Sequence, residues 1–333
     1  MCLCRFAPIP GLPVLPFTNG GFSAVCHCGS LLDDKRSQAV VIGKFDYNFI
    51  QPHGDCAIES AGRLITILAE MKSVAVALSG GVDSAVVAKA AYLALGDRAV
   101  AFTADSPSVA RRDLEAAHLV ASTIGMRHEV LKTSEFEKAA YRANDGTRCY
   151  HCKSELYLQV AARLVEFGLA VVCSGANQDD LGDYRPGLAA AAERGVRHPL
   201  IEAGIGKAEV RALAKAWDLP VSQKPASPCL SSRLAPGVEA TAERVARVED
   251  AETFLRELGY ADCRVRVHAG ELARIEIPTG DIDGFFLKGH GVEARRKMTE
   301  LGFRFVTIDL GGLNSGGMNE LVPLEIRARF SRP

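Results

Sequence analysis

Three cysteines in two short motifs are the side chains of this sequence with the clearest capacity for chemistry. Cys149 and Cys152 form a Cys-x-x-Cys pair just before a predicted helix, and Cys229 stands in the motif Pro-Cys-Leu-Ser-Ser-Arg. A Cys-x-x-Cys pair near a helix start has a lowered thiol pKa, which suits redox chemistry or metal ligation. Three thiolates suit a [4Fe–4S] cluster with one iron open to a non-protein ligand. A structural zinc ion completed by His151, or cysteines that only pack, are the alternatives.

A second motif predicts a phosphate-binding loop. The string Val-Ala-Leu-Ser-Gly-Gly-Val-Asp-Ser over 76–84 joins a short apolar strand to a helix through two glycines. Free backbone N–H groups and the positive end of the helix dipole then surround one point, where an anionic pyrophosphate fits. The loop lacks the lysine of the Walker motif. An ordinary strand-to-helix turn is the alternative, and the complete string disfavours it.

Strands that alternate with helices position both motifs. Apolar runs over 74–78 and 170–174 indicate strands covered on both faces, so Cys173 is expected in the core. Further strands are predicted over 98–103 and 128–131, with helices over 58–71, 84–95, 109–124 and 153–167. This alternation is typical of a doubly wound parallel α/β sheet.

The pattern changes after Pro225. A helix over 239–258, strands over 263–268, 273–278 and 303–309, and a helix over 292–301 indicate a smaller α+β domain. The first 52 residues are rich in Pro, Gly and Ser and have no sustained period, which is typical of a poorly ordered extension. We therefore predict an extension over 1–52, an ATP-binding domain over 53–225 and a C-terminal domain over 226–333.

The composition limits the class of protein. With 48% hydrophobic and 24% charged residues, the chain of 333 residues has the make-up of a globular protein of two domains. The net charge of -1 argues against a nucleic-acid partner. No apolar run is long enough for a membrane span, and Met1 to Gly20 lacks the pattern of an export signal. We expect a cytoplasmic protein, in which ten cysteines favour metal or redox chemistry over disulfides.

Around the phosphate loop the sequence resembles the PP-loop ATP pyrophosphatase superfamily, whose mark is Ser-Gly-Gly-x-Asp-Ser. Those enzymes have an adenine nucleotide alpha hydrolase-like fold and cleave ATP between the α- and β-phosphates. They adenylate a carboxylate or carbonyl oxygen, and a nitrogen or sulfur nucleophile then displaces AMP. The resemblance implies that ATP and Mg²⁺ are bound, with these ATP-binding residues: Ser79, Gly80, Gly81, Asp83, Ser84, Ser106, Gly175 and Asn177.

Residues 53–330 resemble the LarE-type ATP-dependent sulfur transferases of nickel-pincer nucleotide synthesis. The likeness rests on the phosphate loop, Arg-Cys-Tyr-His-Cys-Lys, the stretch 175–187, Pro-Cys-Leu-Ser-Ser-Arg and the stretch 264–276. It implies that Cys229 is the sulfur source. In one branch of the family this cysteine loses its own sulfur and becomes dehydroalanine. In the other, three cysteines hold a [4Fe–4S] cluster with an extra sulfide, and Cys149, Cys152 and Cys229 resemble that branch.

The substrate that this resemblance implies is pyridinium-3,5-biscarboxylic acid mononucleotide, a polyanion that becomes a thiocarboxylate. The matching positions are the arginines Arg233, Arg264, Arg266 and Arg274 and the acidic residues Glu252 and Asp283. Guanidinium groups suit carboxylates and phosphates because they donate two parallel hydrogen bonds. Arg264 and Arg266 project to the same face of a strand, for which a solvated face is the alternative. The family also implies a homo-oligomer.

The sequence departs from the family at Asn314 and Gly317, which replace a usual arginine and serine. The departure bears on substrate choice and leaves the ATP-binding half unchanged. Three other functions stay open. An amidating synthetase of the NAD or GMP synthetase type needs no cysteine trio, a cluster-dependent tRNA thiolase needs a basic RNA-binding surface, and a nucleotide-binding regulatory protein binds ATP without releasing pyrophosphate.

Overall fold

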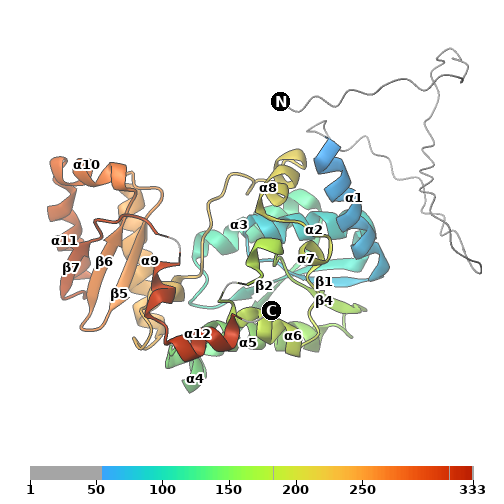
Figure 1. Ribbon diagram of the computed structural model, residues 1–333, viewed down its shortest axis with the longest axis horizontal. Helices are drawn as coiled ribbons and strands as arrows, with labels where there is room; N and C mark the ends of the chain where they lie inside the picture. The colour runs from blue at the N-terminus through green and yellow to red at the C-terminus, as the bar shows by residue number, and fades with distance from the viewer. Residues whose placement is uncertain (1–54, 183, 315, 332–333) are drawn as a thin grey trace, which may run out of the picture. The chain divides into compact units, whose positions relative to one another are not determined.

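The computed structural model describes residues 55–182, 184–314 and 316–331, and the predicted extension over 1–52 lies outside them. Residues 47–333 make up one unit, whose described part contains two sheets (Figure 1). Each sheet has a hydrophobic core of its own. The domain boundary at residue 225 stays a prediction.

The larger sheet has four parallel strands in the order β3–β2–β1–β4. They are β1 (Val74–Ala77), β2 (Ala99–Asp105), β3 (Arg127–Lys132) and β4 (Val171–Cys173). Val74 is paired with Ala99 on one side and with Val171 on the other, so β1 is a central strand. The predicted parallel α/β sheet is confirmed, and the phosphate loop begins where β1 ends.

Helices cover both faces of this sheet because β1 is apolar on both. Val74 and Val76 belong to a core with α1, α2, α3 and α8, whereas Ala75 and Ala77 belong to a core with α5 and α6. The helices of this part are α1 (Asp55–Glu70), α2 (Val82–Leu95), α3 (Arg111–Ile124), α4 (Ala139–Arg142), α5 (Arg148–Arg163), α6 (Pro186–Glu193), α7 (Pro199–Glu202) and α8 (Lys207–Ala216). The sequence analysis assigned no element over 175–225, where α6, α7 and α8 lie.

The smaller sheet has the order β5–β6–β7. β5 (Arg264–His268) and β6 (Leu272–Glu276) are antiparallel, and β7 (Phe305–Ile308) is parallel to β6. The accompanying helices are α9 (Ala242–Glu257), α10 (Ile282–Leu287), α11 (His290–Glu300) and α12 (Leu324–Phe330). Val265 and Val267 point into a core with Val245 and Val248 of α9. The α+β character predicted after Pro225 is therefore confirmed.

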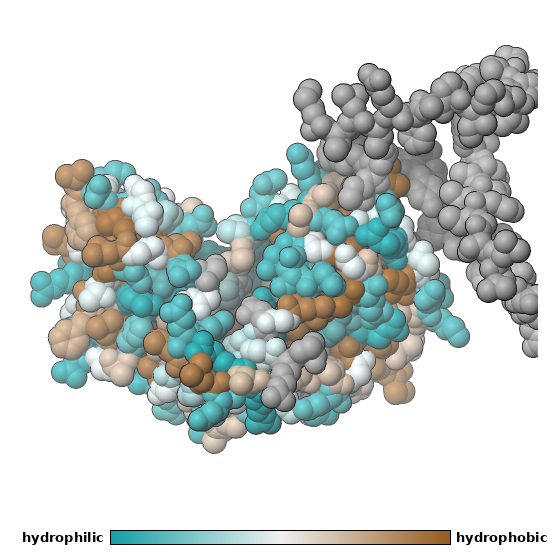
Figure 2. Space-filling model, in the orientation of Figure 1, coloured by the Kyte–Doolittle hydropathy of each residue, from teal (hydrophilic) through white to brown (hydrophobic). Residues whose placement is uncertain are grey.

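The surface is mixed, with apolar side chains gathered over α10 and α11 (Figure 2). Phe286, Leu287 and Val292 are 56%, 87% and 77% exposed. Every helix between residues 55 and 331 is too short or too polar to cross a bilayer.

Candidate active site

Hydrogen bonds of Ser79 and Ser84 fix the conformation of the phosphate loop. The backbone N–H of Ser79 donates to Ser84 Oγ at 3.1 Å, and the two hydroxyl oxygens are also 3.1 Å apart. Ser84 Oγ donates to the carbonyl of Gly81 at 3.2 Å. Gly81 precedes the first turn of α2 and offers no side-chain acceptor to its N–H groups. The loop therefore has the strand-to-helix arrangement in which N–H groups can bind an anion, and pyrophosphate binding by its residues stays a prediction.

Two glycines of the site are required by close backbone approaches. Gly80 has a φ of 71°, and a Cβ there would lie 2.2 Å from the carbonyl oxygen of Asp113. At Gly175, a Cβ would lie 2.6 Å from the backbone nitrogen of Ser84. The segment after β4 therefore packs directly against the phosphate loop. Two stretches that are far apart in the sequence, both predicted to bind ATP, are brought together here.

A carboxylate and an amide mark the junction of these stretches. Asn177 Nδ2 donates to Asp83 Oδ1 at 2.7 Å, and the Asn177 backbone N–H donates to Asp180 Oδ2 at 3.1 Å. Burial raises the pKa of the Asp83 carboxyl, the hydrogen bond from Asn177 opposes this rise, and the charge of Asp180 adds to it. A partly desolvated carboxylate beside a phosphate loop is suited to a divalent cation.

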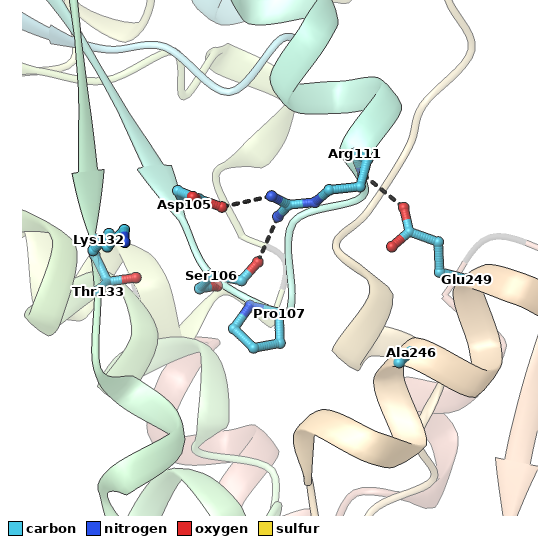
Figure 3. A pocket seen from close by; sticks show the side chains of 8 residues that line it. All are labelled: Asp105, Ser106, Pro107, Arg111, Lys132, Thr133, Ala246 and Glu249. Atoms are coloured by element: carbon cyan, nitrogen blue, oxygen red, sulfur yellow. Dashed lines mark hydrogen bonds and ion pairs between the residues drawn. The ribbon is translucent and has the colours of Figure 1, made fainter.

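Ser106 lies at a cavity of about 390 Å³ at the carboxyl ends of β2 and β3 (Figure 3). Arg111 crosses this cavity: its Nη1 is 2.6 Å from Asp105 Oδ1, and its Nη2 donates to the carbonyl of Ser106 at 2.9 Å. Glu249 of α9 faces them from the other side and accepts the backbone N–H of Arg111 at 2.6 Å. The Ser106 hydroxyl is hydrogen-bonded to Ser108 at 2.8 Å. ATP binding by Ser106 stays a prediction.

The two cysteine motifs border one hydrophobic core, because Cys152 packs against the cluster that contains Leu230, next to Cys229. Cys149 is exposed in the first turn of α5, and Cys152 and Cys229 are half-buried. The lowered thiol pKa expected of the Cys-x-x-Cys pair is wrong for Cys152: burial raises its pKa, and the charges of Glu135, Cys229 and Cys149 raise it further. The influence of Cys229 agrees with the packing of Cys152 against the core that contains Leu230. In the part of the chain that the structure describes, no three His, Cys, Asp or Glu side chains converge as a single metal ion requires.

Two cations and a phenol surround the thiols. Burial alone would lower the pKa of the Arg148 guanidinium, but Cys149, Cys229 and neighbouring groups hold it raised. The pKa of Lys153 is raised by Tyr157 and, to a smaller extent, by all three cysteines. Tyr141 is 1% exposed, and its hydroxyl is hydrogen-bonded to Ser231, two residues after Cys229. No role of Tyr141 is predictable from the sequence, because a lone tyrosine belongs to no motif.

Arg233 and Glu252 form a buried ion pair. Arg233 Nε and Nη2 donate to the two carboxylate oxygens of Glu252 at 2.8 and 3.2 Å, and both side chains are at most 2% exposed. Arg233 Nη1 donates to the carbonyls of Pro228 and Cys229, while Glu252 also accepts the backbone N–H of Val265. This pair fixes the backbone of Cys229 relative to β5. Substrate binding by either residue stays a prediction.

The strand arginines form a second group. Arg264 and Arg266 share one face of β5, as predicted, because both donate to the carbonyl of Asn314, at 2.9 and 3.4 Å. Arg266 and Arg274 are both paired with Glu276, at 3.0 and 3.1 Å. Within the described chain Arg264 has no carboxylate partner, although it is only 6% exposed. Burial lowers the pKa of Arg264, and the charge of Arg266 lowers it further.

Three further positions, Asp283, Asn314 and Gly317, were singled out from the sequence. Asp283 is exposed on α10, and its side chain makes no hydrogen bond or ion pair with another described residue. Gly317 begins a 3-10 turn, and a Cβ there would lie 3.7 Å from Asn314 Nδ2. Asn314 contacts the arginines through its carbonyl, so its side chain is not what they bind. A role of Asp283 at the site stays a prediction.

Comparisons with known proteins place this geometry in a family. The family model for NAD synthase matches residues 66–155, which include the phosphate loop. The pyridinium-3,5-bisthiocarboxylic acid mononucleotide synthase of Lactiplantibacillus plantarum is 36% identical over 269 residues, 80% of this chain and 96% of that protein. The chain belongs to the LarE family of PP-loop ATP pyrophosphatases.

Other LarE-like relatives extend the comparison. An uncharacterized protein of Synechocystis is 46% identical over 253 residues, covering 76% of this chain and 94% of its own length. One from Methanocaldococcus jannaschii is 28% identical over 239 residues, 72% of this chain and 90% of its own. Membership in the LarE family makes the chain an enzyme of the PP-loop type and implies ATP and Mg²⁺ binding.

Proposed function

We propose that the chain is an ATP-dependent sulfur transferase that converts a carboxylate of pyridinium-3,5-biscarboxylic acid mononucleotide, or a close analogue, to a thiocarboxylate. The observation that carries the proposal is the packing of Cys152 against the core that contains Leu230, the neighbour of Cys229, while the cations Arg148 and Lys153 flank the Cys-x-x-Cys pair on α5. An ammonia-using synthetase needs no cysteine trio. The name of the Lactiplantibacillus relative, a bisthiocarboxylic acid mononucleotide synthase, supports sulfur as the transferred element.

The first step is formation of an acyl-adenylate. A carboxylate oxygen attacks the α-phosphorus of ATP, the bond from that phosphorus to the bridging oxygen breaks, and pyrophosphate leaves with the electron pair. The first-turn N–H groups of α2 and the hydroxyls of Ser79 and Ser84 bind the departing pyrophosphate. The step is needed because an oxide ion does not leave a carboxylate at neutral pH, whereas AMP does.

Asp83 fits the Mg²⁺ that the family implies. Mg²⁺ is usually bound by one or two carboxylates together with phosphate oxygens, and Asp83 lies in the first turn of α2 beside the phosphate loop. Asp180 is near enough to raise the pKa of Asp83, but its own oxygens are paired with Arg185 and with the backbone N–H of Asn177. When bound, the ion supplies positive charge to the phosphates. Asn177 Nδ2 donates to Asp83 Oδ1 at 2.7 Å, and this hydrogen bond fixes the orientation of the Asp83 carboxylate.

The second step transfers sulfur. A sulfur nucleophile presented at Cys229 attacks the acyl carbon, and AMP leaves with the electron pair of the broken C–O bond. Arg233 holds the backbone of Cys229 in place for this attack. Arg264 is suited to a substrate anion, since a buried guanidinium without a carboxylate partner is costly until an anion pairs with it.

The cysteine trio fits a [4Fe–4S] cluster in ligand type and in charge. Cys149, Cys152 and Cys229 would hold it, and Arg148 and Lys153 would offset the negative charge of the thiolates. Such a cluster, when bound through three cysteines, offers an open iron at which an additional sulfide can be carried. The spacing that a single metal ion requires is a different and tighter one.

Anaerobic purification with iron and sulfide quantified tests the cysteine assignment. We expect iron and acid-labile sulfide in the wild type and their loss in Cys149→Ala and Cys229→Ala, whereas Cys173→Ala, a change in the core of β4, keeps both. With ATP, Mg²⁺ and the dicarboxylate nucleotide, the wild type should release pyrophosphate and AMP and yield the thiocarboxylate, detected by its mass.

Other results would contradict parts of this proposal. If Cys229 loses the mass of its sulfur after turnover, the cysteine itself is the sulfur donor, and the cluster assignment is wrong. Product containing nitrogen from added ammonia, or sulfur found only in tRNA, would overturn the substrate assignment. ATP binding without pyrophosphate release in the presence of each acceptor would indicate a regulatory protein.

A further inference from the structure

The phosphate loop of this chain has no lysine, but a lysine from elsewhere contacts it. Lys224 lies in the segment between α8 and Cys229, and its Nζ donates to the carbonyl of Gly80 at 2.8 Å. The same ammonium group is 2.7 Å from Asp113 Oδ1 at the start of α3. No sequence motif indicated this contact, because more than a hundred residues separate Lys224 from the loop.

Lys224 has little freedom to lie anywhere else. Its side chain is 19% exposed, and its backbone carbonyl accepts a hydrogen bond from Arg211 at 3.2 Å. Asp113 packs so closely on the loop that Gly80 is required there. Ser227 Oγ, three residues after Lys224, donates to the second oxygen of Asp113 at 3.3 Å. The segment that leads to Cys229 is thus attached to the phosphate loop at this junction.

The ammonium group still has a donor to offer. A lysine ammonium has three N–H donors, and among the described residues Lys224 makes one hydrogen bond, to Gly80, and one ion pair, with Asp113. The loop itself supplies only N–H and hydroxyl groups to a pyrophosphate of several negative charges. Lysine serves other phosphate loops as a point charge for this reason.

The geometry points to Lys224 as a further catalytic residue, which contacts the phosphate chain of ATP and stabilises the pyrophosphate that leaves. This inference rests on the proposed adenylation of a carboxylate. In that step the α-phosphorus exchanges its bridging oxygen for a carboxylate oxygen, and the negative charge that develops on pyrophosphate is the charge that Lys224 meets. No proton or further reactant is needed.

Pyrophosphate binding and the half-reaction test this role. In Lys224→Met we expect the affinity for Mg²⁺–pyrophosphate, measured by calorimetry, to fall about 10- to 100-fold, the range for one hydrogen bond to a charged group. The kcat for pyrophosphate release should fall by a similar factor at saturating ATP, because the interaction strengthens as the leaving group forms. Lys224→Arg keeps the charge and should recover part of both.

Two further variants separate this role from a structural one. Lys215→Met, an exposed lysine of α8, should leave affinity and kcat unchanged. Asp113→Asn removes the ion pair but keeps Lys224, and should lose less than about threefold. An equal loss in Asp113→Asn, or a Lys224→Met enzyme within twofold of wild type, would overturn the inference. If the wild type releases no pyrophosphate, the proposed function fails, and calorimetry still decides the role of Lys224.

Discussion

Two buried arginines of the site differ in whether they have a carboxylate partner. Arg233 is paired with Glu252 through two hydrogen bonds, whereas Arg264 has a single described hydrogen bond, to the carbonyl of Asn314. A buried ion pair contributes little net stability, but removal of one partner leaves an uncompensated charge. The structure therefore predicts unequal losses of stability for two substitutions that look alike in the sequence.

Arg233→Met should lower the free energy of unfolding by about 3 kcal/mol, because the buried Glu252 then keeps only a 3.6 Å ion pair with Arg256 and the hydrogen bond from Val265. Arg264→Met should change it by less than about 1 kcal/mol, because a charge without a carboxylate partner is removed from a buried place. Urea denaturation measures both. In the double variant Arg233→Met/Glu252→Gln most of the loss should be recovered, and equal losses in the two single variants would contradict this assignment.

At the scale of elements, the strand-to-helix junction depends on backbone contacts more than on side chains. The loop between β1 and α2 contacts the start of α3 at Gly80 and the segment after β4 at Gly175. Ser79 and Ser84 then set the separation of the strand end and the helix start. The loop has little room to shift because these two neighbours approach it at backbone distance.

Gly80→Ala should abolish pyrophosphate release and lower the free energy of unfolding by about 1–3 kcal/mol, since a left-handed φ and a 2.2 Å contact cannot both be relieved. Gly62→Ala is the matched control, because no atom lies within 4 Å of its Cβ in α1. That change should raise the free energy of unfolding by about 0.5–1 kcal/mol through helix propensity. An active Gly80→Ala enzyme would show that the loop can shift.

At the scale of the whole described chain, the two sheets are linked at the cavity of Figure 3. Glu249 of α9 accepts the first N–H of α3, where Ala110 offers no side-chain cap. The cysteine trio likewise combines α5 with the segment before α9. The exposed apolar residues over α10 and α11 are compatible with the homo-oligomer expected from the sequence, which stays a prediction (Figure 2).

Glu249→Ala should cost about 0.5–2 kcal/mol of unfolding free energy, the range for loss of a helix N-cap, because the N–H of Arg111 loses its acceptor. Asp250→Ala changes an exposed neighbour on α9 and should cost less than about 0.5 kcal/mol. Thermal or urea unfolding of the pair gives the comparison. Indistinguishable stabilities would mean that the contact contributes nothing to holding α9 against α3.

Much of the fold followed from the sequence alone. Two apolar runs and two further strands, alternating with helices, predicted the parallel sheet, and Ser-Gly-Gly-Val-Asp-Ser predicted the phosphate loop, because hydrophobic periodicity and glycine turns are local properties. The short helices α4, α6, α7, α10 and α12 were not predicted, since a helix of four to eight residues carries too little periodicity, and the ten-residue α8 was not predicted either. The motifs of the sequence also identified the candidate cysteines and arginines of the site.

Only the tertiary structure decided which of those residues have partners. It paired Arg233 with Glu252, left Arg264 without a carboxylate, and brought Lys224 and Tyr141 to sites that no motif indicated. Spacing along the chain determines which side chains share a face of one element. The pairing of charges between elements depends on how those elements pack, and that is fixed by the cores of the two sheets rather than by any local pattern.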